Sequence, residues 1–274
     1  MGAEAVVGVI GGGQLCRMMA QAVKRANLPL TLIALEATRN CPARGEAYDL
    51  IEGDVKDSRQ IRKLADISDV LTYELEWTDV PTLKNLEKSG KTVHPSPDTL
   101  GIIQDKYTQA KFLRNNKLPV PDFCQVDNEE DARQAGMALG FPFMVKSRRD
   151  SYDGKGNYLV QNPKDIEDAV RHFKGRPLMA QRFVRFACEV SVIAARNIKG
   201  EIAAYDVGEN KHENNILHTT LVPARISPPC AERAKEVAGN VLDALKGAGV
   251  FGIEMFVEKE LLDFLFPCGF IENA

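Results

Sequence analysis

The sequence predicts an α/β protein in two parts, a doubly wound parallel sheet over residues 1–98 and an α+β part over residues 99–274. Three observations lead to this fold class. Short apolar runs alternate with helical patterns through residues 5–94, which is typical of βα units around a parallel sheet. Residues 143–160 hold two apolar runs joined by a charged, glycine-containing loop, which is typical of a hairpin. Residues 189–207 alternate in polarity as two paired strands would.

The first part begins with an apolar strand, a glycine-rich turn (GGG at 11–13) and an amphipathic helix. Such a turn places backbone N–H groups and a helix N-terminus where an anion can sit. A dinucleotide-binding fingerprint would need glycine at position 16, where this chain has Cys16. Glu36 stands where a ribose-binding acid would be, so an NAD-dependent enzyme remains an alternative. We expect strands at 5–10, 30–35, 48–52, 69–76 and 91–94, and helices at 14–27, 57–66 and 79–89.

Two carboxylates end the strand expected at 69–76. Glu74 and Glu76 lie two residues apart, so on a strand they would point to the same face. Ligands of open α/β sheets collect at the carboxyl edge of the strands. The pair is therefore either a functional edge or a solvated strand end.

The second part follows a proline-containing boundary at 95–97. We expect helices at 99–115, 128–139, 163–173 and 229–248, and strands at 177–183, 189–195, 201–207 and 250–257, besides the hairpin. The last strand carries Glu254 in an otherwise apolar run, and a buried glutamate needs a partner or a metal. The apolar stretch at 261–271 has no obvious core to join.

The hairpin loop after Lys146 is rich in features that suit a phosphate. It holds Arg148, Arg149 and Lys155 together with two glycines. Glycines let the backbone approach a ligand, and successive N–H groups beside basic side chains form a cradle for phosphate oxygens. The competing interpretation is a solvated hairpin tip.

Composition excludes several functional classes. The chain has 274 residues and a net charge of −3, which gives no electrostatic basis for nucleic acid or an anionic membrane as main partner. Six scattered cysteines without metal-like spacing indicate reduced thiols and a cytoplasmic or organelle-matrix location. We see no secretory signal and no apolar run long enough to span a bilayer.

Seven stretches occur together in one order: GVIGGGQLCRM (8–18), TYELE (72–76), QDKYTQ (104–109), VKSRRDSYDGKGN (145–157), FACEVSVIAAR (186–196), ENKHENNIL (209–217) and GVFGIEMFV (249–257). With them the chain resembles the ATP-grasp ligases, and among these the 5-(carboxyamino)imidazole ribonucleotide synthases of purine (IMP) biosynthesis. The resemblance covers residues 8 to about 258. It implies a Rossmann-like pre-ATP-grasp domain at 1–98 and an ATP-grasp domain at 99–274. Within the latter, a lid subdomain covers about 118–184, a further part 185–258 and an atypical tail 259–274.

The resemblance also implies functions for individual residues. It implies ATP contacts for Lys106, Lys146, Tyr152, Asp153, Gly154, Lys155, Gly156, Asn157, Gln181, Arg182, Phe183, Val184, Glu189 and His212. It implies ribonucleotide contacts for Gln14, Leu15, Glu76, Tyr152 and Lys155, catalytic roles for Lys146, Tyr152 and Lys155, and a Mg²⁺ ligand in Glu254.

The implied reaction is ATP- and bicarbonate-dependent carboxylation of 5-aminoimidazole ribonucleotide through carboxyphosphate. ATP and Mg²⁺ are the implied cofactors, the partners are small molecules, and the family is often dimeric, which suggests a homodimer. Neither a nucleic acid nor a membrane is an implied partner.

The chain departs from the family pattern at three places. Cys16 replaces a glycine of the turn, which would narrow the substrate pocket or tilt the helix. Gln181 stands where the family usually has glutamate. The stretch after residue 258 lacks the family segment that supplies a second Mg²⁺ carboxylate and an arginine, so the ATP-grasp domain is expected to be incomplete at its C-terminus. The competing hypotheses are therefore an active ligase, a catalytically impaired ATP-binding fragment, and a sister ATP-grasp carboxylase or formyl-phosphate ligase.

Overall fold

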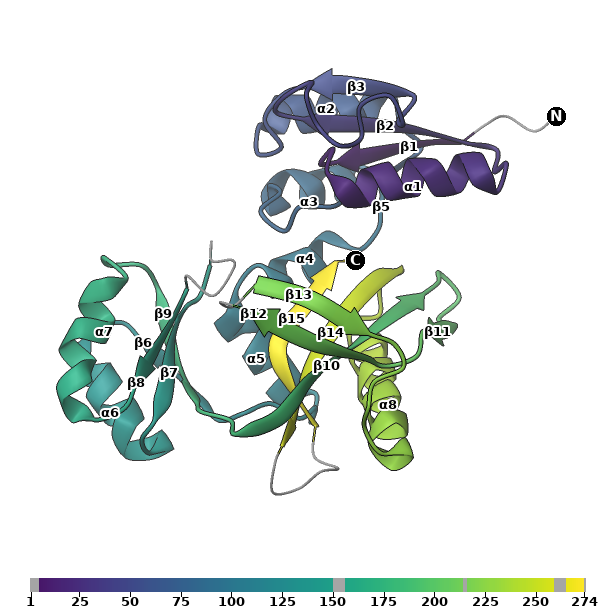
Figure 1. Cartoon of the computed structure of the whole chain (residues 1–274). Coiled ribbons are helices and arrows are strands. Elements are labelled where there is room, and N and C mark those ends of the chain that lie inside the picture. Colours follow the sequence, from purple (N-terminus) through teal and green to yellow (C-terminus); the bar gives the residue numbers. More distant parts are fainter. Residues whose placement is uncertain (1–4, 150–155, 214–215, 259–264, 274) are drawn as a thin grey trace.

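The computed structural model contains three sheets, and each forms the centre of a separate part of the molecule (Figure 1). It describes residues 5–149, 156–213 and 216–258, and the backbone of 265–273. A parallel sheet of order β3-β2-β1-β4-β5 forms the first part. A four-stranded antiparallel sheet, β6-β9-β7-β8, and a six-stranded sheet, β13-β12-β10-β14-β15 with β11 beside β10, form the second. We call these the parallel, the small and the large sheet.

The parallel sheet is doubly wound, as expected. Its elements are β1 Ala5–Ile10, α1 Gln14–Arg25, β2 Leu30–Glu36, β3 Asp49–Glu52, α2 Ser58–Asp66, β4 Val70–Tyr73, α3 Val80–Lys88 and β5 Thr92–Val93. Neighbouring residues of β1 face opposite sides, since Val9 packs beneath α1 and Ile10 packs with α2 and α3. Cys16 lies in the cluster beneath α1, fully buried, so its side chain fills core space rather than the glycine turn.

The strand expected at 69–76 is shorter in the structure. β4 ends at Tyr73, so Glu74 and Glu76 follow the strand and are not two steps along one strand face. The expectation that strand alternation aligns them is therefore wrong. Glu74 instead turns back to the glycine turn, as described below.

The helix expected at 99–115 is two helices. α4 spans Pro97–Ile103 and α5 spans Lys106–Asn115. The side chain of Asp105 accepts hydrogen bonds from the backbone N–H groups of Tyr107 and Thr108, at 3.0 Å each. This is the geometry of a helix N-cap, and it starts a new helix where propensity alone would continue the old one.

The small sheet contains the expected hairpin, β7 Phe143–Ser147 and β8 Asn157–Val160, paired antiparallel. Its remaining elements are β6 Phe123–Val126, α6 Glu129–Leu139, the short 3₁₀ turn Pro163–Asp165, α7 Ile166–His172 and β9 Leu178–Arg182. Phe143 and Val145 pack beneath α6 and α7, whereas Met179 on the other face packs with α5. Lys146 pairs with Met179 and so belongs to the face that is turned away from α6 and α7.

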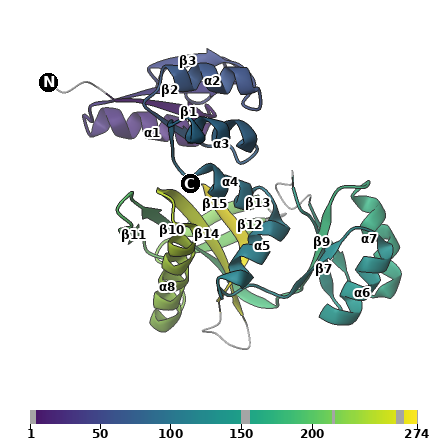
Figure 2. The ribbon, with the colours of Figure 1, turned by 180° about the vertical axis from the view of Figure 1, so that it is seen from behind.

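The large sheet is apolar on one face. Its elements are β10 Phe186–Arg196, β11 Ile202–Ala204, β12 Gly208–Glu213, β13 Ile216–Leu221, β14 Gly249–Glu258 and β15 Leu265–Asn273, with α8 Pro228–Leu245 against it (Figure 2). Val190, Val192 and Phe251 pack with Val237 and Val241 of α8. The alternate residues of β10 and β14 consequently face the other way, toward the site.

Residues 265–273, which include most of the apolar stretch at 261–271, join the large sheet. The backbone of β15 pairs antiparallel with β14, from Val257 opposite Leu265 to Phe251 opposite Asn273. The register shifts between Ile253 and Met255, next to Glu254. Residues 265–273 thus have a backbone partner at the edge of β14, while the expectation that the stretch has no core to join stays a prediction.

The buried face of β14 gives a stability prediction. Replacing Phe251, which is fully buried beneath α8, with alanine should lower the free energy of unfolding by about 3–5 kcal/mol, because it leaves a cavity. Val250→Ala, at a 41% exposed position of the same strand, should cost about 0.5 kcal/mol. Urea denaturation followed by circular dichroism measures both. Equal costs would contradict the assigned faces of the strand.

Candidate functional site

The polar face of the large sheet is centred on a carboxylate–imidazole pair. Glu189 of β10 and His212 of β12 approach to 2.7 Å between Oε2 and Nδ1. Burial raises the pKa of Glu189 above its ordinary value, while the positive charges of His212 and Lys146 oppose this rise. Lys146 belongs to the small sheet. Because its charge opposes the rise in the pKa of Glu189, residues of both sheets contribute to the electrostatics of this site.

A second row of polar side chains crosses the same face. The Oδ1 of Asn210, on β12, accepts hydrogen bonds from Ser191 on β10 at 3.1 Å and from Thr220 on β13 at 3.0 Å. Asn210 is only 7% exposed and lies opposite Glu189 in the strand register. Sequence reasoning did not select these three residues. The alternation of Asn210 and His212 along one strand was the available signal, because residues two apart on a strand share a face.

Glu254 is the carboxylate that suits a metal on this face. It is half-buried on β14 and lies opposite Ser191 of β10. Within the described side chains, no three histidine, cysteine or acidic residues cluster closely enough to hold a metal ion. Mg²⁺ commonly takes one or two protein carboxylates and completes its octahedron with phosphate oxygens and waters. A single carboxylate on the polar face of the sheet fits that pattern.

The small sheet contributes Lys146 and the residues around it. Lys146 is 8% exposed and pairs across the hairpin with Asn157. The Oδ1 of Asn157 is buried and has no hydrogen-bond partner among the described residues, and buried acceptors of this kind are usually satisfied by water or a ligand. Gly156 is buried, and its carbonyl accepts from Ser147 N at 2.8 Å. Tyr152, Asp153, Gly154 and Lys155 lie outside the described residues.

The segment at 181–184, for which the family resemblance implies ATP contacts, connects the small and large sheets, and we call it the hinge. Gln181 is 4% exposed at the end of β9, Val184 is buried, and Arg182 and Phe183 are half-buried. Arg182 forms an ion pair of 3.7 Å with Glu258 at the end of β14. The segment therefore borders both sheets.

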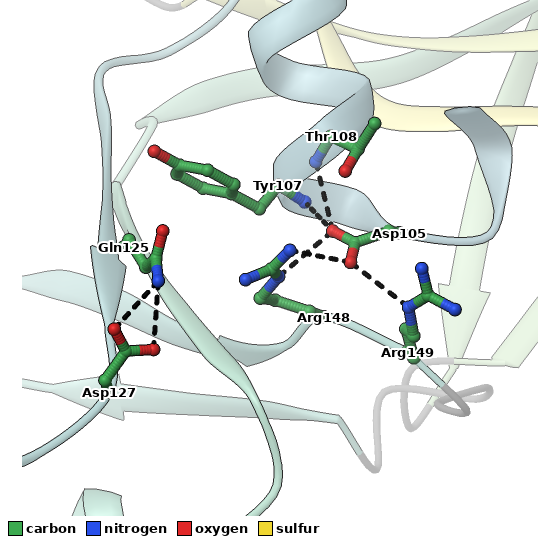
Figure 3. Close-up of polar contacts among 7 residues, drawn as sticks. All are labelled: Asp105, Tyr107, Thr108, Gln125, Asp127, Arg148 and Arg149. Carbon is green, nitrogen blue, oxygen red and sulfur yellow. Dashed lines mark hydrogen bonds and ion pairs between the residues drawn. The ribbon is translucent and has the colours of Figure 1, made fainter. Parts of the chain in front are cut away.

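The start of α5 is tied to the end of β7 by two arginines that meet the buried Asp105 (Figure 3). Asp105 accepts from Arg148 at 3.1 and 2.8 Å, in a bidentate arrangement, and from the Nε of Arg149 at 3.1 Å. Burial alone would raise the pKa of Asp105, but the hydrogen bonds from Arg148, Thr108 and Arg149 outweigh it and hold that pKa below its usual range. Lys106 is the first residue of α5, and its backbone N donates to Arg148 O at 2.9 Å.

The glycine turn of the parallel sheet is occupied by the chain's own carboxylates. Gly12 N donates to Glu36 at 2.9 Å, and Gly13 N and Leu15 N donate to the two oxygens of Glu74 at 2.8 and 3.2 Å. The anion expected at this turn is thus supplied by the protein's own glutamates rather than by a ligand. Glu36 is engaged with the turn, which argues against a role in holding an NAD ribose.

Of the expected ribonucleotide residues, Gln14, Leu15 and Glu76 are among the described ones, and they lie at the carboxyl edge of the parallel sheet. Gln14 is exposed and Leu15 half-buried at the start of α1, and Glu76 is half-buried after β4. The Nε2 of Gln104, at the end of α4, donates to Glu76 O at 2.6 Å. This bond connects the carboxyl edge of the parallel sheet to the α4–α5 junction, one residue from Asp105.

Comparisons with known protein families agree with this geometry. Residues 4–104 match a model described as "Ribonucleotide synthetase preATP-grasp domain", and residues 111–264 match "ATP-grasp domain". The fold and site therefore define an ATP-grasp protein.

Individual relatives narrow this class. The chain is 39% identical over 256 residues to the N5-carboxyaminoimidazole ribonucleotide synthase of Brucella melitensis, with 93% of this chain and 70% of the relative covered. It is also 39% identical over 256 residues to the phosphoribosylaminoimidazole carboxylase of Candida glabrata, covering 92% of this chain and 44% of the relative. A crystal structure of N5-carboxyaminoimidazole synthase from Aspergillus clavatus with ADP and 5-aminoimidazole ribonucleotide superimposes with a TM-score of 0.88 at 31% identity, covering 98% of this chain and 69% of that one.

The chain belongs to the N5-carboxyaminoimidazole ribonucleotide synthase family of ATP-grasp proteins. It spans less than half the length of the fungal carboxylases, for example 44% of the Candida glabrata protein.

The Glu189 site predicts an unusual dependence of stability on pH. The folded-state pKa of Glu189 is raised above 4.5, so its stabilising contribution is complete below 4.5 and is lost as pH rises through the folded value. The stability of Glu189→Gln relative to wild type should therefore increase from about pH 4.5 to 7. Urea denaturation across this range measures it.

Glu209→Gln on the neighbouring strand is the matched control. Hydrogen bonds from Arg225 lower the pKa of Glu209, so wild type should gain stability relative to this variant above 4.5 and lose that gain as pH falls. Identical pH profiles for the two variants would contradict the burial assigned to Glu189.

Proposed function

We propose that the protein carboxylates 5-aminoimidazole ribonucleotide, using ATP and bicarbonate and releasing ADP and phosphate. The observation that carries this proposal is that Glu189 of the large sheet pairs with His212 and also feels the charge of Lys146 from the small sheet. Relatives that share this fold have been crystallised with ATP, with ADP, and with ADP plus 5-aminoimidazole ribonucleotide.

In this proposal the nucleotide lies between the two sheets. Lys106 and Lys146 contact its phosphates, and the hinge at 181–184 contacts the adenine through backbone groups. Glu189 accepts hydrogen bonds from the ribose hydroxyls, and His212, already oriented by Glu189, adds a further nucleotide contact. Asn157 and Gly156 border the triphosphate, together with Tyr152, Asp153, Gly154 and Lys155.

The chemistry proposed for the site is phosphoryl transfer followed by carboxyl transfer. A bicarbonate oxygen attacks the γ-phosphorus, the bond to ADP breaks, and carboxyphosphate forms. The exocyclic amine of the ribonucleotide then attacks the carboxyl carbon, phosphate leaves, and the amine loses a proton. Lysine ammonium groups stabilise the charge that develops on the phosphoryl oxygens, which is usually the largest contribution in such reactions.

The ribonucleotide is proposed to bind between the carboxyl edge of the parallel sheet and the ATP cleft. Gln14, Leu15 and Glu76 contact it, and Tyr152 and Lys155 also act on it. Glu254 would hold Mg²⁺, which when bound neutralises charge on the nucleotide phosphates. Excluding water protects carboxyphosphate from hydrolysis.

A domain division at residues 98 and 99, a homodimer and a cytoplasmic location also remain predictions. Among the described helices none is long and apolar enough to cross a membrane.

Release of ADP by the purified chain, with Mg-ATP, bicarbonate and 5-aminoimidazole ribonucleotide, tests the function. Turnover should require the ribonucleotide. Lys146→Met should lower kcat by about 10²-fold or more, because it removes a charge that stabilises the transferring phosphoryl group. Lys164→Met, at an exposed position of the same part of the molecule, should leave kcat unchanged.

Nucleotide binding without ribonucleotide-dependent turnover would contradict the ligase and leave an impaired ATP-binding protein. Turnover with a different acceptor would support a sister ATP-grasp ligase. Binding of NAD in preference to ATP would contradict the family-based assignment of the cleft.

Glu254 gives a separate prediction about metal. Glu254→Gln should raise the Mg²⁺ concentration that gives half-maximal ADP release by about tenfold or more, since it removes a charged oxygen ligand. Glu201→Gln, at an exposed carboxylate in the turn between β10 and β11, serves as control. An unchanged Mg²⁺ requirement would show that Glu254 does not hold the metal.

A further inference from the structure

A charge cluster around the buried Asp105 joins α5 to the end of β7 in the small sheet. α5 begins directly after Asp105, and Leu113 of α5 belongs to the core of the large sheet. Arg148 and Arg149 follow directly after β7 of the small sheet. Figure 3 shows both arginines turned toward Asp105 from the opposite side. α5 packs against both sheets, and the cluster ties its first residues to the end of β7.

Asp105 accepts far more hydrogen bonds than a helix cap requires. Its two oxygens accept from the N–H groups of Tyr107 and Thr108, twice from Arg148 and once from Arg149. A carboxylate offers about four lone-pair positions, so this one is fully used. By contrast, the cap of α3 is Asp79, whose carboxylate accepts from Thr82 N at 2.9 Å.

Burial makes the arginines necessary. The side chain of Asp105 is 3% exposed, and that of Arg148 is 19% exposed. A buried carboxylate is costly unless it is paired and hydrogen-bonded, and a bidentate arginine pair fixes direction as well as charge. The ring of Tyr107 lies 4.9 Å from the guanidinium carbon of Arg148 and further restricts it.

The cluster also fixes the backbone that follows Lys146. Arg148 N donates to Pro177 O at 3.0 Å, and Arg148 O accepts from Lys106 N at 2.9 Å. The hydroxyl of Ser147 donates to Arg149 O at 2.8 Å. The stretch from Ser147 to Arg149 is thus held on both sides, and Lys146 immediately precedes it.

We propose that Asp105 is a positioning residue: through Arg148 and Arg149 it clamps the end of β7 to the start of α5, and so fixes Lys146 and Lys106 relative to the Glu189–His212 pair. Asp105 itself does not touch the reactants. The expected effect of Asp105 on turnover rests on the proposed function. The clamp itself and its effect on ADP affinity do not depend on which molecule accepts the carboxyl group.

Asp105→Asn tests the clamp, because asparagine still caps a helix but carries no charge. Its affinity for ADP, measured by calorimetry, should fall by about tenfold or more, and kcat at saturating ATP should fall as well. Asp79→Asn makes the same change at a cap that has no arginine partner within the described residues, and it should alter neither ADP affinity nor kcat. A loss of thermal stability alone, with ADP affinity and kcat as in Asp79→Asn, would overturn the proposal.

A double-mutant comparison shows whether Asp105 acts through the arginines. In an Arg148→Met, Arg149→Met background, adding Asp105→Asn should change ADP affinity by less than twofold. A full additional loss would mean that Asp105 acts by another route. If Asp105→Asn fails to fold, Arg148→Lys keeps the charge but loses the bidentate geometry, and it should weaken ADP binding in the same direction.

Hydrogen exchange provides a measurement that needs neither nucleotide nor turnover. The amide of Lys106, which bonds across the two parts, should exchange at least tenfold faster in Asp105→Asn, while amides in the middle of β10 should not change. If wild type shows no ADP release, the proposed reaction fails but the exchange and ADP-binding results still decide the clamp. Unchanged exchange at Lys106 would refute the clamp whatever the catalytic result.

Discussion

The structure depends on the antiparallel pairing of β10 with β14, which runs from Phe186 opposite Glu258 to Arg196 opposite Gly249. Because side chains alternate along both strands, one face can be apolar and bury itself against α8 while the other carries polar groups. Moving either strand by one residue would exchange the faces and place Glu189 and Glu254 in the apolar core. The hydrophobic core and the chemistry of the site are therefore set by the same register.

Much of the fold follows from local sequence. The βα alternation predicted the doubly wound sheet, and the two apolar runs around the glycine loop predicted the β7–β8 hairpin. The misses have physical causes. The break between α4 and α5 depends on a cap whose full stabilisation comes from Arg148, more than forty residues away. The pairing of β15 depends on the open edge of β14, which no local pattern reveals.

The candidate site was accessible from sequence only in part. A lysine ending an apolar run and a glutamate within an apolar strand stand out locally, and Lys146 and Glu254 were found this way. Ser191, Asn210 and Thr220 are ordinary surface residues in sequence, and only the register of three strands brings them together. The role of Asp105 was also hidden in the sequence. An aspartate before a helix indicates a cap, but its arginine partners follow a strand of the small sheet. The catalytic and binding roles of the expected residues remain proposals.

The internal carboxylates at the glycine turn have a consequence for selectivity among cellular nucleotides. A parallel sheet with a glycine-rich first turn is the usual receptor for a dinucleotide pyrophosphate. Here such a ligand would have to displace Glu36 and Glu74 from the amides of Gly12, Gly13 and Leu15, and would then meet two like charges. The N-terminal part thus has the fold of a dinucleotide-binding domain, but its own carboxylates repel a pyrophosphate at the glycine turn. A neutral or hydroxyl-bearing portion of a ligand can approach this edge of the sheet, whereas a second phosphate-rich cofactor is turned away.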